Sequence, residues 1–143
     1  MQERVKAIVE GDMIFRLFDM ELVEAGEGFA SVRAEVKKSF LNAHNIAHGS
    51  LIFALLDVAF AIAANSLTDA VGIQWSINMV KSALAGDHVK AEAKLIHRGK
   101  HSLVFELKAE SETTNKLLAQ GIATALPFPR ERIGAAPIQA ENH

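Results

Sequence analysis

One carboxylate interrupts an otherwise apolar stretch of the sequence. Between Leu51 and Ala64 every residue is hydrophobic except Asp57. An unpaired charge in such surroundings costs on the order of several kcal/mol even after the protein relaxes around it. A carboxylate kept there is a candidate for chemistry, because an ionised Asp can deprotonate water or attack an electrophile directly. A structural acid held by a neighbouring strand is the alternative interpretation of Asp57.

The residues that could act with Asp57 precede it in a loop and at the start of a predicted helix. Gly49 can present a bare backbone N–H at the positive end of the helix dipole, where an oxyanion could be held. Asn42 lies six residues before His48, and Asp57 lies nine residues after it. His48 could take part directly or could only satisfy a loop carbonyl.

The spacing between Gly49 and Asp57 limits how the two residues could cooperate. They lie eight positions apart on the predicted helix, which corresponds to about 12 Å along the helix axis. A single carbonyl group cannot touch both residues within one chain. Two antiparallel copies of the helix would bring Asp57 of one near Gly49 of the other. The spacing therefore favours a site shared across a homodimer, if the two residues act together.

Metal, thiol and serine chemistry are not expected from this sequence. His44 and His48 lie four residues apart, a spacing that suits metal ligands on a helix. No third ligand follows at a suitable spacing, so we expect no metal. The 143-residue chain has no cysteine, which excludes thiolate nucleophiles. Ser50 follows Gly49 outside any Gly-x-Ser-x-Gly motif, which argues against a serine hydrolase.

The composition indicates a soluble cytoplasmic protein. The formal charge is −2 and no long basic run is present, so nothing points to nucleic acid or to an acidic membrane. The apolar run Leu51–Ala64 is shorter than the roughly 20 residues that cross a bilayer, and it carries Asp57. The N-terminal segment lacks the long apolar core of a signal peptide.

The elements that would position these residues follow from hydrophobic periodicity. Residues 1–18 predict an N-terminal helix, and residues 49–65 predict a central helix with Ser50 as its N-cap. The central helix is apolar nearly all round and so must be enclosed. A period of two dominates elsewhere and predicts an antiparallel sheet of five to six strands. We expect one α+β domain over residues 1–143, with residues 128–143 as a flexible tail.

The stretch Asn42–Asp57, NAHNIAHGS followed by six residues and Asp, resembles the signature of hotdog-fold acyl-CoA thioesterases of the PaaI-like group. In that group an Asn is followed by His-Gly-Gly, and an Asp lies eight residues after the first Gly. The segments Ser76–Val80, Ala85–Asp87 and Arg98–Lys100 follow in the family's order. The resemblance covers roughly residues 20 to 126.

This resemblance implies a hotdog fold, dimers with a continuous sheet that often pair into tetramers, and hydrolysis of an acyl-CoA thioester without a cofactor. Gly49 would polarise the thioester carbonyl, and His48 would hold the loop or assist. Asn42 would position substrate or water, and Asp57 of the other subunit would be the general base or the nucleophile. A hotdog hydratase or dehydratase, and a non-catalytic acyl-CoA-binding protein, are the alternative functions.

The sequence departs from the family pattern at two positions. Ser50 replaces the second Gly of His-Gly-Gly, and Gly72 stands where some relatives carry a hydroxyl that orients water. Strict alternation would place Gln74 and Ser76 on the same strand face as Gly72, so either could substitute for that hydroxyl. Trp75 is expected in the core, or as part of the lining of an acyl pocket. Arg98 and Lys100 could contact the phosphates of coenzyme A or form a solvated turn.

Overall fold

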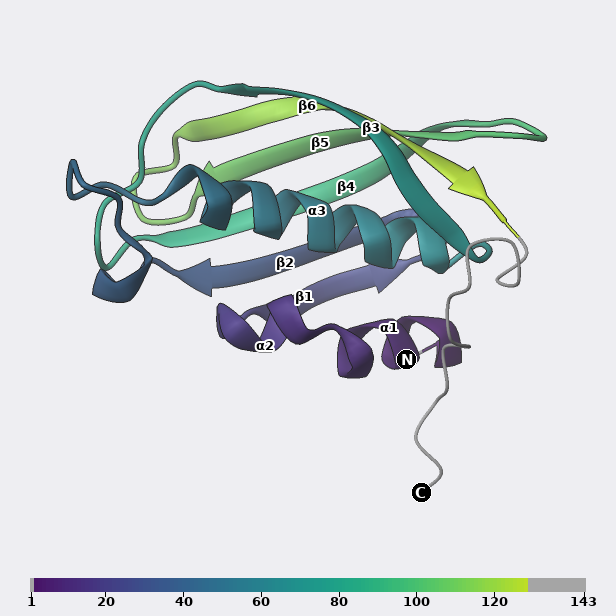
Figure 1. The fold of residues 1–143 in the computed structure, drawn as a ribbon, viewed down its shortest axis with the longest axis horizontal. Coiled ribbons are helices and arrows are strands. Elements are labelled where there is room, and N and C mark those ends of the chain that lie inside the picture. The colour runs from purple at the N-terminus through teal and green to yellow at the C-terminus, as the bar shows by residue number, and fades with distance from the viewer. Residues whose placement is uncertain (1, 129–143) are drawn as a thin grey trace.

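The computed structural model describes residues 2–128 and shows one sheet curved around one helix (Figure 1). The central helix is α3 (Gly49–Asn65), and α1 (Glu3–Gly11) and α2 (Met13–Leu17) pack beside it. All strand pairs are antiparallel, in the order β1-β2-β4-β5-β6-β3. The strands are β1 (Glu21–Gly26), β2 (Phe29–Glu35), β3 (Ala70–Met79), β4 (His88–Arg98), β5 (Leu103–Ser111) and β6 (Leu117–Pro127), and η1 (Lys38–Phe40) is a short 3-10 helix. The predicted α+β layers are confirmed.

The core lies between α3 and the concave face of the sheet. Leu51, Leu55 and Leu56 of α3 are fully buried, as are Phe105 and Leu107 of β5. Each such side chain contributes about 1.5–3 kcal/mol relative to full exposure. The prediction that α3 is enclosed on all sides is only partly right, because one stripe of the helix stays uncovered.

The start of α3 differs from the sequence prediction. His48 is the N-cap, and its Nδ1 accepts a hydrogen bond of 3.0 Å from the Ser50 backbone N–H. The prediction of Ser50 as the N-cap is therefore wrong. An imidazole nitrogen can replace the usual capping oxygen because it is also an acceptor, and this moves the first helical residue to Gly49.

The end of α3 is fixed to the start of β3 by one side chain. The Asn65 amide donates to the Ala70 carbonyl at 3.1 Å, and its carbonyl oxygen accepts from the Ala70 N–H at 3.1 Å. The Asn65 side chain is buried, so these hydrogen bonds satisfy polar groups that would otherwise be unpaired. Asn65 thereby sets the position of β3 against the helix.

A β-bulge at Ile73 reverses the alternation of β3. Gly72 pairs with Ala125 and Trp75 with Ala123, and both of these Ala residues are buried against the core. Gln74 falls on the opposite face. The prediction that Gln74 and Ser76 share a face with Gly72 is therefore wrong, because the extra residue of a bulge shifts the period of two.

Close packing between β6 and β3 requires a glycine at position 121. A Cβ there would lie 2.1 Å from the Ser76 carbonyl oxygen and 2.9 Å from the Ile77 Cα. We expect Gly121→Ala to lower the free energy of unfolding by about 1–3 kcal/mol, since backbone must move. Urea denaturation measures this. Gly26→Ala is the matched control, because no atom lies within 4 Å of its Cβ position, and equal effects of the two changes would contradict the packing argument.

No helix within residues 2–128 is long and apolar enough to span a membrane. Residues 129–143, the greater part of the predicted tail 128–143, lie outside the described residues. Phe128 is described, and its N–H donates to the Asp69 carbonyl at 3.1 Å. The sheet and helices of the described part are consistent with the single domain predicted for residues 1–143, which stays a prediction.

Candidate active site

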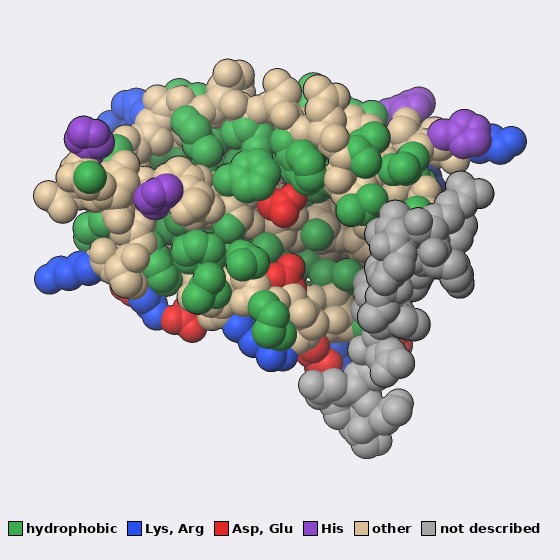
Figure 2. All heavy atoms as spheres, in the orientation of Figure 1, with side chains coloured by type: hydrophobic (Ala, Val, Ile, Leu, Met, Phe, Trp, Pro, Cys, Tyr) green, Lys and Arg blue, Asp and Glu red, His purple; other side chains and the backbone are tan. Residues whose placement is uncertain are grey.

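Asp57 lies on the stripe of α3 that neither the sheet nor α1 covers. The more accessible positions of the helix after its first turn are Phe53, Ala54, Asp57 and Ala61, which are three to four residues apart and so share one face. Figure 2 shows this side of the molecule, where hydrophobic side chains surround acidic groups. The carboxylate of Asp57 is thus half-buried, within reach of a ligand, and set in an apolar surface.

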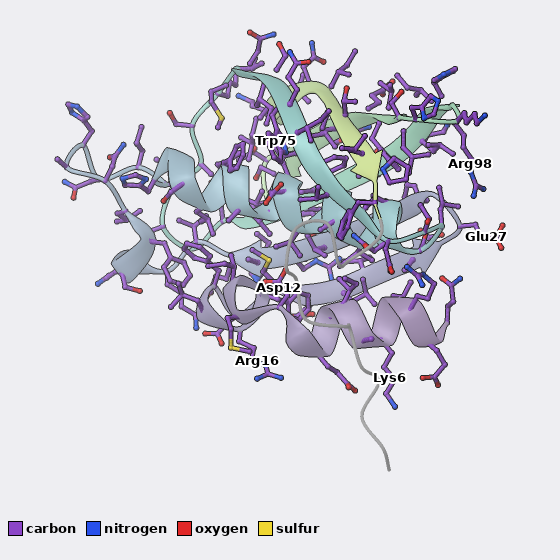
Figure 3. The ribbon with its side chains drawn as sticks, turned by 45° about the vertical axis from the view of Figure 1, so that its right-hand side comes forward. Lys6, Asp12, Arg16, Glu27, Trp75 and Arg98 are labelled. Atoms are coloured by element: carbon purple, nitrogen blue, oxygen red, sulfur yellow. The ribbon has the colours of Figure 1, made fainter. Side chains whose placement is uncertain are left out.

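The indole of Trp75 holds this carboxylate. Its Nε1–H donates a hydrogen bond of 3.0 Å to Asp57 Oδ1. The ring packs against Phe53 and Phe60 of α3, with ring centroids 6.0 Å away in both cases. Figure 3 labels Trp75 on β3, beside the central helix. Aromatic pairs at this separation stabilise one another, so the indole and its N–H are well fixed.

The surroundings of Asp57 favour its protonated form. Burial raises the pKa of the Asp57 carboxyl above its usual 3.8, the Trp75 N–H opposes this rise, and the negative charge of Asp12 adds to it. Asp12 lies at the junction of α1 and α2 (Figure 3), where its Oδ1 caps α2 through the N–H groups of Ile14 and Phe15. A carboxylate of raised pKa is a stronger base once ionised.

Asn42 lies in the loop before α3, and this loop leads to His48 and Gly49 at the start of the helix. Asn42 Oδ1 accepts from the His44 N–H at 2.9 Å, which folds the loop back on itself. His48 is exposed and caps the helix. Within residues 2–128 no hydrogen bond uses the Gly49 N–H, and no atom lies within 4 Å of the Gly49 Cβ position. Gly49 therefore offers a free donor at an open helix N-terminus.

Within a single chain, Gly49 and Asp57 are too far apart to contact the same substrate carbonyl group. Gly49 and Asp57 lie on the same straight element, two turns apart, or about 12 Å along its axis. Both are accessible from outside the subunit, since Gly49 is exposed and Asp57 half-buried. Gly49 and Asp57 can therefore each contact a group of another molecule.

The predicted substrate-binding residues lie in three separate places. Gly72 lies beneath the Trp75 ring, where a Cβ would be 2.3 Å from Cζ2. Gln74 and Ser76 face outward on β3, and Ser76 lines a hollow of about 380 Å³ on the outer face of the sheet. Arg98 is exposed at the end of β4, well away from Trp75 (Figure 3), and Lys100 is exposed in the following turn. Their roles in binding stay predictions.

Comparison with known proteins decides the family. A sequence model of the Thioesterase superfamily matches residues 44–118, more than half of the chain. The chain belongs to this superfamily. A putative esterase from Archaeoglobus fulgidus is 40% identical over 121 residues, which are 83% of this thioesterase and 78% of the relative. The acyl-coenzyme A thioesterase PaaI of Escherichia coli is 33% identical over 107 residues, 74% and 76% of the two chains.

Solved structures agree with this assignment. The E. coli PaaI protein from the phenylacetic acid degradation operon superposes with a TM-score of 0.82 at 27% identity, covering 90% of this thioesterase and 97% of that chain. A Streptococcus mutans protein bound to acetyl CoA gives a TM-score of 0.72 at 27% identity, with 76% and 88% covered. The predicted hotdog fold, the PaaI-like resemblance and the prediction of a thioester hydrolase are confirmed.

Two residues next to Asp57 of this thioesterase were not among the predicted site residues. Trp75 was expected in the core or at an acyl pocket, and no role in the site was expected for Asp12. The sequence did offer one indication of the position of Trp75. Gly72 is a glycine inside a strand, and such a glycine often marks a bulge or a close approach of another group. No sequence pattern connects Asp12 with Asp57, since only the packing of α1 and α2 against α3 relates them.

Proposed function

We propose that this thioesterase hydrolyses an acyl-CoA thioester to a free acid and coenzyme A. The observation that carries the proposal is Asp57, a carboxylate of raised pKa on the uncovered stripe of an apolar helix. Its surroundings cost stability, which is typical of a carboxylate that reacts. The E. coli relative is named an acyl-coenzyme A thioesterase, which supports coenzyme A as the carrier.

In the proposed reaction the Gly49 N–H donates to the thioester oxygen, and the Asp57 carboxylate takes a proton from water. The hydroxyl oxygen bonds to the thioester carbon, and the charge passes to the carbonyl oxygen held by Gly49. The C–S bond then breaks, and the departing sulfur receives the proton from Asp57. If Asp57 attacks the carbon itself, the C–S bond breaks, coenzyme A leaves as a thiolate that takes a proton from solvent, and the acyl anhydride formed on Asp57 is hydrolysed by water. Both routes need the ionised carboxylate.

We place this site between two subunits, with Gly49 from one and Asp57 from the other. The edge position of β3 supports this, since within residues 2–128 only β6 pairs with it. Val71, Ile73 and Met79 of β3 are exposed although apolar, and an open apolar edge favours pairing with another chain. Pairing β3 with its copy would join the sheets and bring two copies of α3 together. Such dimers would pair further into tetramers.

Four of the remaining predicted residues have a place in this proposal. In this proposal Asn42 orders the loop by accepting from the His44 N–H, and His48 caps α3 by accepting from the Ser50 N–H. Together they keep the Gly49 N–H at the open helix start. Arg98 and Lys100 supply positive charge at the β4–β5 turn, where phosphates of coenzyme A would bind. Gln74 and Ser76 lie on the other face of β3 from Trp75 and Asp57, and their role in substrate binding stays a prediction.

A panel of acyl-CoA substrates with short, medium and aromatic acyl groups tests the proposal, with release of free coenzyme A thiol as the readout. We expect turnover of at least one of them, and little turnover by Asp57→Asn. Tight binding of acyl-CoA without turnover would instead make the protein an acyl-CoA-binding protein. Hydration or dehydration of an acyl thioester without thiol release would also refute the proposal.

A further inference from the structure

We propose that Trp75 is a positioning residue that holds the Asp57 carboxylate in its reactive orientation. The indole N–H fixes Oδ1 at 3.0 Å. Within residues 2–128 no hydrogen bond uses Oδ2, so this oxygen is left for the reacting water or the thioester carbon. The inference rests on the proposed role of Asp57.

Three features of β3 act together to deliver this N–H. The bulge at Ile73 turns Trp75 toward α3, on the same face as Gly72. Gly72 leaves the space that the indole fills, because a Cβ there would be 2.3 Å from Cζ2 and 2.8 Å from Cη2 of Trp75. Asn65 ties the start of β3 to the end of α3. Removing any one of these features would move the indole away from Asp57.

The same arrangement accounts for the missing hydroxyl at Gly72. A side chain at this position and the Trp75 ring exclude each other, since the added atoms would overlap. The strand therefore supplies one polar group near Asp57, and in this chain that group is an indole N–H. An indole N–H is a donor only, so it can hold the carboxylate but cannot activate water itself.

The effect of Trp75 on the titration of Asp57 has a definite sign. A donor to the carboxylate stabilises the ionised form and lowers the pKa, whereas burial and the charge of Asp12 raise it. Removing the N–H must move the pKa of Asp57 upward. Because the reaction needs the carboxylate, the acidic limb of kcat/KM must then move to higher pH.

Fluorescence tests the contact without any substrate, because Trp75 is the single tryptophan of the chain. We expect its emission to change with pH as Asp57 titrates, with a midpoint above the ordinary range of an aspartic acid. In Asp57→Asn this transition should disappear. Emission that is independent of pH in the unmodified protein, or the same transition in Asp57→Asn, would overturn the proposal whether or not the enzyme hydrolyses acyl-CoA.

Kinetics of Trp75→Phe test the positioning role. Phenylalanine keeps an aromatic ring and removes the N–H, so we expect kcat to fall about tenfold to a hundredfold with KM within about twofold, and the acidic limb to move to higher pH. Gly72→Ala should reproduce the shift of the limb and alter the emission, since it displaces the indole. An equal loss of rate at every pH, with the limb unmoved, would leave Trp75 only a packing role and refute the proposal.

Discussion

Asp57→Asn is expected to lower kcat/KM for acyl-CoA hydrolysis by about 10²–10⁴, the range that a positioned general base supplies. The amide has nearly the shape of the carboxylate and can still accept a hydrogen bond from the Trp75 N–H, but it can neither take a proton from water nor attack the thioester. Thiol release under kcat/KM conditions measures the loss. A rate within about threefold of the unmodified enzyme would show that Asp57 is not the reacting group.

The same variant is expected to gain thermal stability at neutral pH. Burial raises the pKa of Asp57 in the folded state, so the folded protein binds this proton more tightly than the unfolded chain does. The stability that this group contributes is present in full below the pKa that it has in the unfolded chain. It is lost as the pH rises through the pKa that it has in the folded protein. The neutral amide avoids that loss at pH 7. A lower melting temperature for Asp57→Asn would mean that its inactivity reflects unfolding.

The second large effect is expected from Gly49→Pro, which deletes the backbone N–H that would hold the oxyanion. Proline is tolerated at the first residue of a helix, and His48 before it has φ −62° and ψ 138°, which a following proline permits. Loss of one oxyanion donor typically costs about 10²–10³ in kcat. We therefore expect a loss of this size with the melting temperature retained.

Gly49→Ala is the matched comparison for Gly49→Pro. It adds a Cβ where no atom lies within 4 Å and keeps the N–H. The ratio of kcat between the two variants isolates the N–H itself, and we expect the alanine variant to be faster by about 10²–10³. Equal rates for the two variants would show that Gly49 does not bind the thioester oxygen.

The sequence predicted the elements that depend on simple periodicity. The apolar run around Asp57 predicted a helix over residues 49–65, and α3 has these bounds. The period of two predicted an antiparallel sheet, and in β2 the alternate residues Ala30, Val32 and Ala34 are almost fully inaccessible. The cost of a charge in an apolar run also singled out Asp57 from the sequence alone.

The contacts that orient Asp57 could not be predicted, because each depends on a local exception. The bulge at Ile73 shifts the alternation of β3 and turns Trp75 toward the helix, and a strict period of two cannot predict this. His48 is the N-cap of α3, although N-cap preferences favour a serine, such as Ser50, over a histidine. Asp12 acts on Asp57 only through the packing of α2 against α3.

The central claim is that Gly49 of one subunit works with Asp57 of another, and mixed dimers test it most directly. Asp57→Asn and Gly49→Pro subunits are unfolded together, refolded at equal amounts, and assayed for acyl-CoA hydrolysis. Half of the dimers formed at random carry one subunit of each kind, and one of the two sites in each is intact, so about a quarter of the unmodified activity should return. Activity no higher than the mean of the two separate variants would contradict a site shared between subunits.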